Sequence, residues 1–372
     1  MAQEKLRVGV VFGSRSCEYD VSLKSAASVI ASLDTDKYDV IPLAITRKGT
    51  WLLGVGPAEL QAIEEEKSEQ EYFEQGKAVA LVGDPNVRHL LTLESGKRFG
   101  IEPLDVIFPV LHGPYGEDGT IQGLLEMADV PYVGCSVLGS AVGMDKEIMK
   151  LLFQAVGLPI IDYLVYRRRE WERSPEVVIS AVEQRLGYPC IVKPVNMGSS
   201  VGVGKASDRE ALGQVIAAAV LYDSKIIIER CLNVREISCG VLGNDEPITS
   251  LVGEYVAEEN TFLDYEGKYI DLSFHFDVPA DIPQELAQEI RERSILAYRT
   301  LDLNGLARVD FFLDRDSHYL YINEVNTLPG FTAASVYPKM WLASGLSYPQ
   351  LLDRLIELAL ERYEDRKRNR TN

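Results

Sequence analysis

The chain has 372 residues, 46% of them hydrophobic and 25% charged, with a formal net charge of -18. This composition is typical of a globular protein with room for two or three packed domains, and it excludes collagen-like or disordered chains. The acidic balance, with no basic stripe, argues against nucleic acid as a partner.

The first part of the sequence predicts alternating strands and helices. Residues 6–13 are a continuous apolar run ending in glycine, as in a buried parallel strand, and residues 21–33 follow with helical spacing. Further strands are expected at 38–45 and 104–111. Residues 56–100 are acidic and poorly periodic, and we interpret them as an insertion. We expect residues 1–134 to form a βαβ-type opening domain.

A second region is expected over residues 135–232. Its clearest element is a helix at 145–159, with Asp145 as N-cap and Gly157 and Pro159 at its end. We expect one face of this helix to carry the apolar side chains of Ile148, Leu152 and Ala155. Strands are predicted at 188–194 and 225–230, with a Gly/Ser-rich loop at 196–205.

The third region, residues 233–372, is predicted to be rich in strands. They are expected at 236–243, 248–256, 306–313 and 319–326. Because the last two flank the turn-forming sequence Asp-Arg-Asp-Ser, we expect them to form a hairpin.

Cysteine, histidine and the apolar runs point to a cytoplasmic location. The five cysteines form no CxxC pair, which fits reduced thiols, and the four histidines show no zinc-binding spacing. The first residues contain no apolar signal core, and the longest apolar run, at 215–222, is too short to cross a bilayer. We expect small soluble substrates and no membrane partner.

The predicted hairpin gathers oxygen ligands. Side chains two apart on a strand share a face, so Arg308 lies beside Asp310, and Glu324 beside Asn326. A turn centred near Asp316 would place Arg308 close to Glu324. Carboxylate and amide oxygens without histidine or cysteine favour Mg²⁺ over zinc. The alternative is an ion pair on a solvated sheet face.

The loop 196–205, NMGSSVGVGK, has a composition suited to phosphate. Its glycines allow backbone N–H groups to approach an anion, and Ser199 and Ser200 add hydroxyl donors. It is neither a Walker A loop, since Ser199 and Ala206 stand at required positions, nor a complete dinucleotide fingerprint. The alternative is a glycine-rich turn.

Two lysines and one strand complete a predicted nucleotide site. Lys146 lies in the first turn of its helix, and Lys193 ends the strand before the loop. The apolar strand that ends in Glu229 and Arg230 can bond a purine through its backbone. Surface lysines and a core strand are the alternatives, but the order of these features favours ATP bound over Mg²⁺.

These stretches resemble the ATP-grasp superfamily and, within it, D-alanine–D-alanine ligases. The resemblance covers nearly the whole chain. The motifs that carry it are CEYDVSLKSA, HGPYGEDGTIQG, MDK, VKPVNMGSSVGV, IIIER, DYEGKY, GLARVDFF and NEVNTLPGFTAAS. It implies an α/β fold, with an N-terminal Rossmann-like parallel-sheet domain and two α+β subdomains that clasp ATP. It further implies ligation of two D-alanines with release of ADP and phosphate, and a homodimer.

The resemblance also implies roles for individual residues. The expected metal ligands, for two Mg²⁺ or Mn²⁺ ions, are Asp310, Glu324 and Asn326. The expected ATP ligands are Lys146 and Lys193 for the phosphates, Ser200 on the loop, Glu229, Arg230 and Leu232 for the adenine, and Glu236 for the ribose.

The same resemblance implies a substrate side. The residues expected to bind D-alanine are Glu18, His112 and Ser335. The residues expected to assist the reaction are Arg308 and Gly330 at the oxyanion, Ser199 beside Glu18, and Lys268 and Tyr269 on a closing loop.

One departure and three rival interpretations remain. Ser14 stands where the family usually has a second glycine, which puts fine substrate geometry in question. A sister ligase using D-serine or D-lactate is the first rival, although DYEGKY lacks the histidine of the D-lactate enzymes. An inactive ATP sensor and a nicotinamide oxidoreductase are the others. The intact hairpin residues and the incomplete glycine fingerprint argue against these two.

Overall fold

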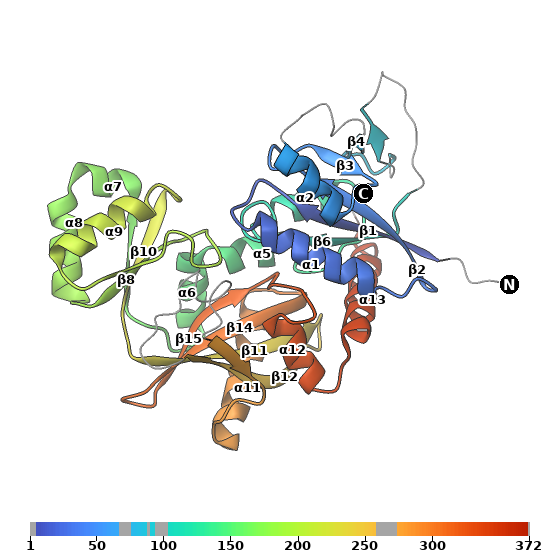
Figure 1. The fold of residues 1–372 in the computed structure, drawn as a ribbon. Helices are drawn as coiled ribbons and strands as arrows, with labels where there is room; N and C mark the ends of the chain where they lie inside the picture. Colours follow the sequence, from blue (N-terminus) through green and yellow to red (C-terminus); the bar gives the residue numbers. More distant parts are fainter. Residues whose placement is uncertain (1–4, 67–75, 88–89, 94–102, 258–273, 371–372) are drawn as a thin grey trace.

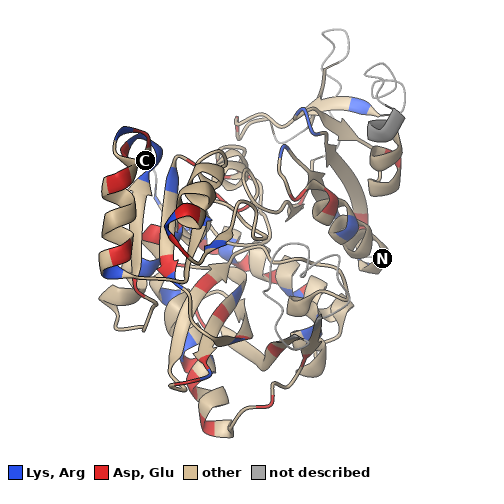
Figure 2. Ribbon diagram, turned by 60° about the vertical axis from the view of Figure 1, so that its left-hand side comes forward, with Lys and Arg blue, Asp and Glu red and all other residues tan. Residues whose placement is uncertain are grey.

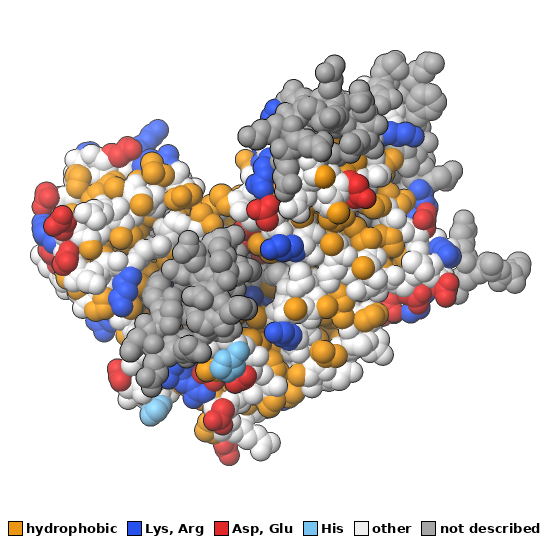
Figure 3. All heavy atoms as spheres, in the orientation of Figure 1, with side chains coloured by type: hydrophobic (Ala, Val, Ile, Leu, Met, Phe, Trp, Pro, Cys, Tyr) orange, Lys and Arg blue, Asp and Glu red, His pale blue; other side chains and the backbone are white. Residues whose placement is uncertain are grey.

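Three sheets organise the molecule (Figure 1). The structure is a computed structural model that describes residues 5–66, 76–87, 90–93, 103–257 and 274–370. Helices flank each sheet, and a lobe carrying α7, α8 and α9 stands apart from the lobe of the first sheet, leaving a notch that is visible in Figure 3.

The first sheet has six strands in the order β5-β4-β3-β2-β1-β6. Its strands are β1 (Leu6–Gly13), β2 (Tyr38–Ile45), β3 (Trp51–Leu53), β4 (Lys77–Ala80), β5 (Leu91–Thr92) and β6 (Val106–Val110). The central strand β1 is parallel to β2 and β6, as its continuous apolar run predicts. The described part of the predicted insertion therefore extends this sheet, because β4 pairs with β3 and β5 pairs with β4.

Helices cover the first sheet and lead into the rest of the chain. They are α1 (Tyr19–Ser32), α2 (Pro57–Glu66), α4 (Thr120–Met127) and α5 (Val137–Met144). Helix α1 follows β1 directly, so the loop between them, which carries Glu18, lies at the carboxyl end of a parallel strand. Ligands bind most often at this edge of an open α/β sheet.

The second sheet is antiparallel, in the order β7-β10-β8-β9. Its elements are β7 (Tyr163–Arg167), α7 (Arg168–Arg173), α8 (Pro175–Arg185), β8 (Cys190–Pro194), β9 (Gly204–Ala206), α9 (Arg209–Ala219) and β10 (Lys225–Arg230). Apolar side chains of α8, α9, β8 and β10 form its core. The predicted Gly/Ser loop connects β8 to β9.

The third sheet is antiparallel, in the order β13-β12-β11-β14-β15. Its strands are β11 (Val234–Gly243), β12 (Ile248–Ala257), β13 (Phe274–Asp277), β14 (Gly305–Asp314) and β15 (Leu320–Asn326). The associated helices are α6 (Lys146–Ala155), α11 (Gln284–Thr300), α12 (Val336–Ala343) and α13 (Tyr348–Arg366). Helix α13 returns to pack on α1 and β6, so one hydrophobic core includes both ends of the described chain (Figure 1).

The predicted hairpin is present, but around Arg308 its register differs by two residues from that of a turn centred near Asp316. Arg308 lies opposite Asn326, and Asp310 lies opposite Glu324, so the residue directly across from Arg308 is Asn326 and not Glu324. A β-bulge between Asp310 and Phe311 leaves Asn323 without an opposite residue, and this shift cannot be read from the alternation of side chains.

The predicted helix at 145–159 is also present, with a different buried face. Asp145 caps it by accepting hydrogen bonds from the N–H groups of residues 147 and 148, and Gly157 follows in a left-handed conformation. The buried side chains are Met149, Lys150 and Phe153, whereas Ile148 is exposed, so the predicted apolar face was wrong. Tertiary packing on β15 selects the face, since Val325 N–H donates to Met149 Sδ.

The distribution of charge fits the composition. Figure 2 shows acidic and basic residues interspersed along the helices and strands that face the viewer. Among the described residues, no helix is both long and apolar enough to span a membrane.

Candidate active site

A cavity of about 1140 Å³ lies between the second and third sheets. It is large enough to enclose a nucleotide-sized ligand. Most of the residues predicted to bind nucleotide or metal line it, namely Lys146, Lys193, Ser199, Ser200, Glu229, Arg230, Leu232, Glu236, Glu324 and Asn326.

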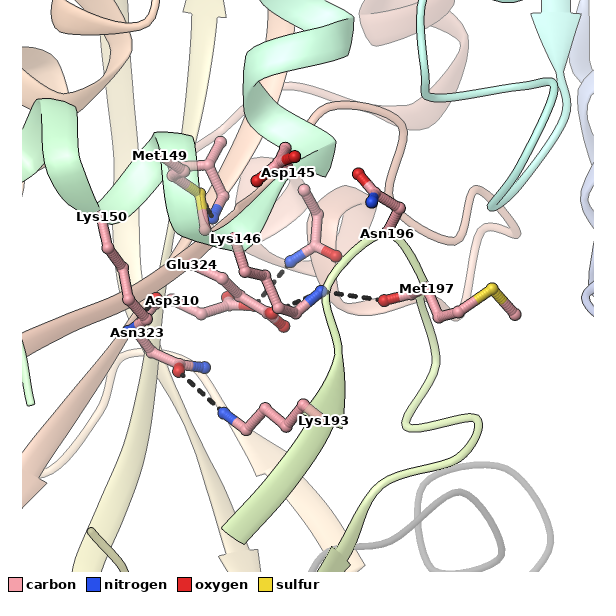
Figure 4. Close-up of polar contacts among 12 residues, drawn as sticks. Asp145, Lys146, Met149, Lys150, Lys193, Asn196, Met197, Asp310, Asn323 and Glu324 are labelled. Atoms are coloured by element: carbon pink, nitrogen blue, oxygen red, sulfur yellow. Dashed lines mark hydrogen bonds and ion pairs between the residues drawn. The ribbon is translucent and has the colours of Figure 1, made fainter. Parts of the chain in front are cut away.

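Lys146 occupies the centre of the polar wall (Figure 4). It is the first residue of α6, and its Nζ lies 2.8 Å from the main-chain oxygen of Met197 and 3.5 Å from Glu324 Oε2. The ammonium therefore bridges the Gly/Ser loop and the hairpin. A cation at a helix N-terminus is unfavourable by itself, so this placement suits a site that receives an anion.

The Gly/Ser loop reaches Glu18. Ser199 and Ser200 both adopt left-handed backbone conformations, with φ of 46° and 58°, and Ser199 Oγ donates a short hydrogen bond to Glu18 Oε1. Burial raises the pKa of Glu18. Gly113 and Gly198 leave room for its carboxylate, because a Cβ at either position would lie 2.4 or 2.7 Å from Glu18 Oε2.

Glu229 is engaged by two lysines. Its carboxylate is buried, with Oε1 at 2.7 Å from Lys150 Nζ and Oε2 at 2.5 Å from Lys193 Nζ. Burial opposes ionisation of Glu229, but the two ammonium groups together lower its pKa to about 2. A role for the Glu229 side chain at an adenine therefore requires this cluster to rearrange. The main chain of β10 is the simpler partner for a base.

The expected metal ligands share one face of the hairpin. Asp310 accepts from Ser238 Oγ at 2.7 Å, from Asn326 Nδ2 at 2.8 Å and from the Arg308 guanidinium at 2.7 to 3.1 Å. Glu324, directly across from Asp310, completes an all-oxygen donor set that fits a hard divalent cation. In the described ranges no group of three or more His, Cys, Asp or Glu side chains is placed to hold a metal. The candidate metal site therefore rests on two carboxylates, Asp310 and Glu324, and one amide, Asn326.

His112 is buried beneath the Pro-Gly turn. Its Nδ1–H donates to the main-chain oxygen of Leu328 at 2.9 Å, so Nε2 accepts from Ser25 Oγ at 3.2 Å. Ser25 Oγ in turn accepts from the N–H of Phe331. Burial lowers the pKa of His112 to about 4. The imidazole is thus neutral near pH 7 and holds both sides of the turn that presents Gly330.

The remaining predicted residues fall into two groups. Ser335 precedes α12, where its Oγ lies 2.8 Å from Thr332 Oγ1 and would be 3.4 Å from a Cβ at Gly330. The two therefore meet at the turn that follows β15. Lys268 and Tyr269 lie outside the described residues.

Two family profiles match nearly all of this chain. The profile described as D-ala D-ala ligase N-terminus matches residues 7–135, and the one described as D-ala D-ala ligase C-terminus matches residues 152–357. The chain belongs to the D-alanine–D-alanine ligase family. The predicted identity and the α/β fold are thereby confirmed.

Curated relatives and solved structures agree with this family. The chain is 49% identical to the D-alanine–D-alanine ligase of Ruminiclostridium cellulolyticum, with 99% of each chain covered, and 48% identical to that of Heliobacterium modesticaldum, with 99% of this chain and 98% of the relative covered. The D-alanine-D-alanine ligase structure from Coxiella burnetii matches with a TM-score of 0.82 at 32% identity. The match covers 98% of this chain and 97% of the Coxiella chain. The VanG D-Ala:D-Ser ligase structure from Enterococcus faecalis matches with a TM-score of 0.83 at 36% identity. The match covers 96% of this chain and 100% of the VanG chain.

Sequence reasoning missed two buried residues at the candidate site of this chain. Glu117 accepts from the N–H groups of Gly113 at 2.9 Å and Leu328 at 3.0 Å, and burial, then the charge of Glu18, raises its pKa to about 8. Lys150 pairs with Glu229, as described above. Glu117 lies within the motif HGPYGEDGTIQG, and Lys150 follows Lys146 by one helical turn, so both signals were in the sequence.

Proposed function

We propose that this chain joins two D-alanines into D-alanyl-D-alanine, with conversion of ATP to ADP and phosphate, as a step in making peptidoglycan precursors. The observation that carries the proposal is the cavity in which Lys146 bridges the Gly/Ser loop and the oxygen-rich hairpin, beside the Glu18–Ser199 contact. The curated relatives named D-alanine–D-alanine ligase support the same activity.

The reaction proceeds in two transfers. A carboxylate oxygen of the first D-alanine attacks the γ-phosphorus, the bond to the β-phosphate oxygen breaks, and ADP leaves. The unprotonated amine of the second D-alanine then attacks the carbonyl carbon of D-alanyl phosphate. The C–O bond to the phosphoryl group breaks, so phosphate departs with that carboxylate oxygen. The ammonium nitrogen loses two protons in becoming an amide N–H, one to the departing phosphate and one to solvent.

Each wall of the cavity has a role in this scheme. Lys146, Lys193 and the Gly/Ser loop with Ser200 bind the phosphates, and Arg230, Leu232 and Glu236, with the backbone of Glu229, hold the nucleoside. Their positions along one cavity support this division. A rigid array of donors and cations lowers the barrier by orientation and charge stabilisation.

Glu18, with Ser199, binds the ammonium of the first D-alanine, and Ser335 binds the carboxylate of the second. Arg308 and the N–H of Gly330 face the oxyanion that develops, while His112 supports this turn from below. The proximity of Gly330 to Ser335 supports a shared substrate site.

Asp310, Glu324 and Asn326 would hold two Mg²⁺ ions, with Mn²⁺ as a substitute. When bound, the metal neutralises charge on the transferred phosphoryl group. Arg308 holds the Asp310 carboxylate in place, and a carboxylate retains further lone pairs for a cation.

Three broader features belong to the same proposal. The chain divides into residues 1–134, a Rossmann-like substrate domain, residues 135–232, a central ATP-grasp subdomain, and residues 233–372, which carry the metal and catalytic residues. It works in the cytoplasm, where its small substrates are found, and it forms a homodimer. Lys268 and Tyr269, which lie outside the described residues, would assist the reaction.

An oxygen-18 label tests whether a carboxylate oxygen of D-alanine leaves with the phosphate. With D-alanine labelled in its carboxylate, ATP and Mg²⁺, we expect dipeptide, ADP and phosphate in equal amounts, with one ¹⁸O in each phosphate, because the oxygen travels with the phosphoryl group. L-alanine is the control and should give no product. Unlabelled phosphate, or ADP without dipeptide, would contradict the proposal.

A further inference from the structure

A buried lysine outside the predicted set lies against the first turn of α6. Lys225, the first residue of β10, has a side chain only 6% exposed. Its Nζ lies 2.8 and 2.6 Å from the two carboxylate oxygens of Asp145 and 2.8 Å from Glu147 Oε2. These two acids stand immediately before and after Lys146, so one ammonium pairs with both acidic neighbours of the lysine that faces the cavity.

The charges in this cluster explain why Lys225 matters to Lys146. Asp145 and Glu147 are both partly buried, at 20% and 27% side-chain exposure, so their attraction for a cation is only partly screened by water. Without Lys225, two carboxylates would compete for the Lys146 ammonium. With Lys225 in place, Lys146 is left directed at Met197 and Glu324 across the cavity.

The main chain carries the same connection to the Gly/Ser loop. The carbonyl of Lys225 accepts from Val195 N–H at 3.0 Å, and the carbonyl of Val195 accepts from Lys146 N–H at 3.4 Å. Asp223 Oδ2 accepts from the N–H of Asn196 at 2.8 Å and from its side-chain amide at 3.0 Å. Residues 223–225 therefore fasten the start of the loop and the start of α6 to one strand.

We propose that Lys225 is a positioning residue for nucleotide binding. It pairs with both Asp145 and Glu147 and joins the N-terminus of α6 to the start of the Gly/Ser loop. Lys146 and the loop N–H groups are thereby preset for a triphosphate. This inference rests on the proposed binding of ATP in the cavity, and it adds a residue that touches no ligand.

The test compares Lys225→Met with Lys77→Met, an exposed lysine of β4 on the first sheet. ATP binding is measured by calorimetry, together with KM and kcat for the ligation. We expect about 10- to 100-fold weaker ATP binding in Lys225→Met, equivalent to the loss of one or two charge-assisted contacts. KM for D-alanine, inhibition by adenosine and the behaviour of Lys77→Met should be unchanged, because none of these involves the phosphates.

Two further variants separate positioning from simple loss of structure. Lys225→Arg should keep most of the ATP affinity, since it restores the charge, and adding Glu147→Gln to Lys225→Met should recover part of the loss by removing one competing carboxylate. If Lys225→Met does not fold, Lys225→Gln replaces it with the same expectation. Unchanged ATP affinity, or equal losses for adenosine and ATP, would overturn the inference. A wild-type protein that binds no ATP would instead overturn the proposed function.

Discussion

Most of the chemistry proposed here depends on a few side chains of the hairpin. Asp310 and Glu324 face each other across β14 and β15, and the side chains of Arg308, Ser238 and Asn326 orient Asp310. The ammonium of Lys146 lies 3.5 Å from Glu324 Oε2. Glu324 is therefore the acid on which the metal assignment depends.

Replacing Glu324 with Gln keeps its shape and removes its charge. We expect kcat to fall by about 10²-fold or more, the scale seen when one preorganised electrostatic group is lost at a reacting centre. Thermal unfolding should stay close to wild type, because this side chain is partly exposed. Raising the Mg²⁺ concentration should restore part of the rate. Near-normal turnover at limiting Mg²⁺ would rule out Glu324 as a metal ligand.

His112 gives the molecule a pH dependence of known sign. Burial lowers its pKa from 6.5 to about 4, so the unfolded chain binds a proton that the folded chain does not. The stability that the neutral imidazole contributes is present above pH 6.5 and is lost as the pH falls toward 4. The loss is about 1.4 kcal/mol for each pH unit in this window.

This dependence is measured as a difference. Urea unfolding of wild type and His112→Gln between pH 7.5 and 4 should show wild type losing stability faster on acidification, because the amide can bond Leu328 without titrating. Other titrating groups, such as Glu117, cancel in the comparison. Curves that run parallel over the whole range would show that His112 does not titrate in this way.

At the scale of elements, helix α6 organises the site. It carries Lys146 toward the cavity, Lys150 toward the second sheet and Met149 toward β15. The buried pair of Lys150 and Glu229 closes one side of the helix, and Asn323, at the bulge of β15, accepts from Lys150 through its main-chain oxygen at 3.2 Å. Two strands and one helix are thereby joined at a single ammonium.

Removing that ammonium should destabilise the protein. Lys150→Met leaves Glu229 buried with one cation instead of two, and breaking a buried pair costs about 3 kcal/mol or more. Lys24→Met, at an exposed position of α1, is the helical control. Adding Glu229→Gln should recover part of the stability, measured by urea unfolding. An equal, small effect of Lys150→Met and Lys24→Met would contradict the account.

How much the sequence predicted varies with the element. The bounds of β1, β2 and β10 match the predicted ranges, and the apolar runs of β1 and β10 are buried on both faces. The register of β14 and β15 could not be predicted, because a bulge at Asn323 depends on contacts from Lys150 and Lys193 on other elements. The buried face of α6 was missed for a related reason, since a buried lysine looks polar until its partner is known.

The candidate site was more predictable than the packing that supports it. Residues such as Lys146 and Glu324 belong to local motifs, and a motif shows its chemistry without any long-range contact. His112 was expected to line the substrate site, but it lies beneath the Pro-Gly turn, bonded to Ser25 and Leu328. Its support for that turn depends on segments more than 200 residues apart, which a single sequence does not connect.

At the scale of the whole molecule, two connections bring the proposed substrates together. Glu18 and Ser199 link the first sheet to the Gly/Ser loop, and α13 packs the end of the chain onto α1 and β6. The first sheet and the hairpin thus share a hydrophobic core, with Leu328 and Phe331 inside it. The proposed substrate-binding residues and the proposed metal ligands are therefore held together by one core.

The choice of second substrate is the central claim that remains to be measured. D-serine and D-lactate, the substrates of the rival sister ligases, are the two competitors to test. D-lactate presents a neutral hydroxyl at every pH, whereas an amine must lose a proton before it attacks, so low pH favours the hydroxy acid.

The decisive measurement is a competition among equal concentrations of D-alanine, D-serine and D-lactate with ATP and Mg²⁺, from pH 6 to 9, with products separated by mass. We expect D-alanyl-D-alanine to dominate throughout, with no appreciable D-alanyl-D-lactate even at pH 6. Dominant D-alanyl-D-serine at any pH, or D-alanyl-D-lactate at the acidic end, would contradict the proposed function and assign this chain to a sister ligase.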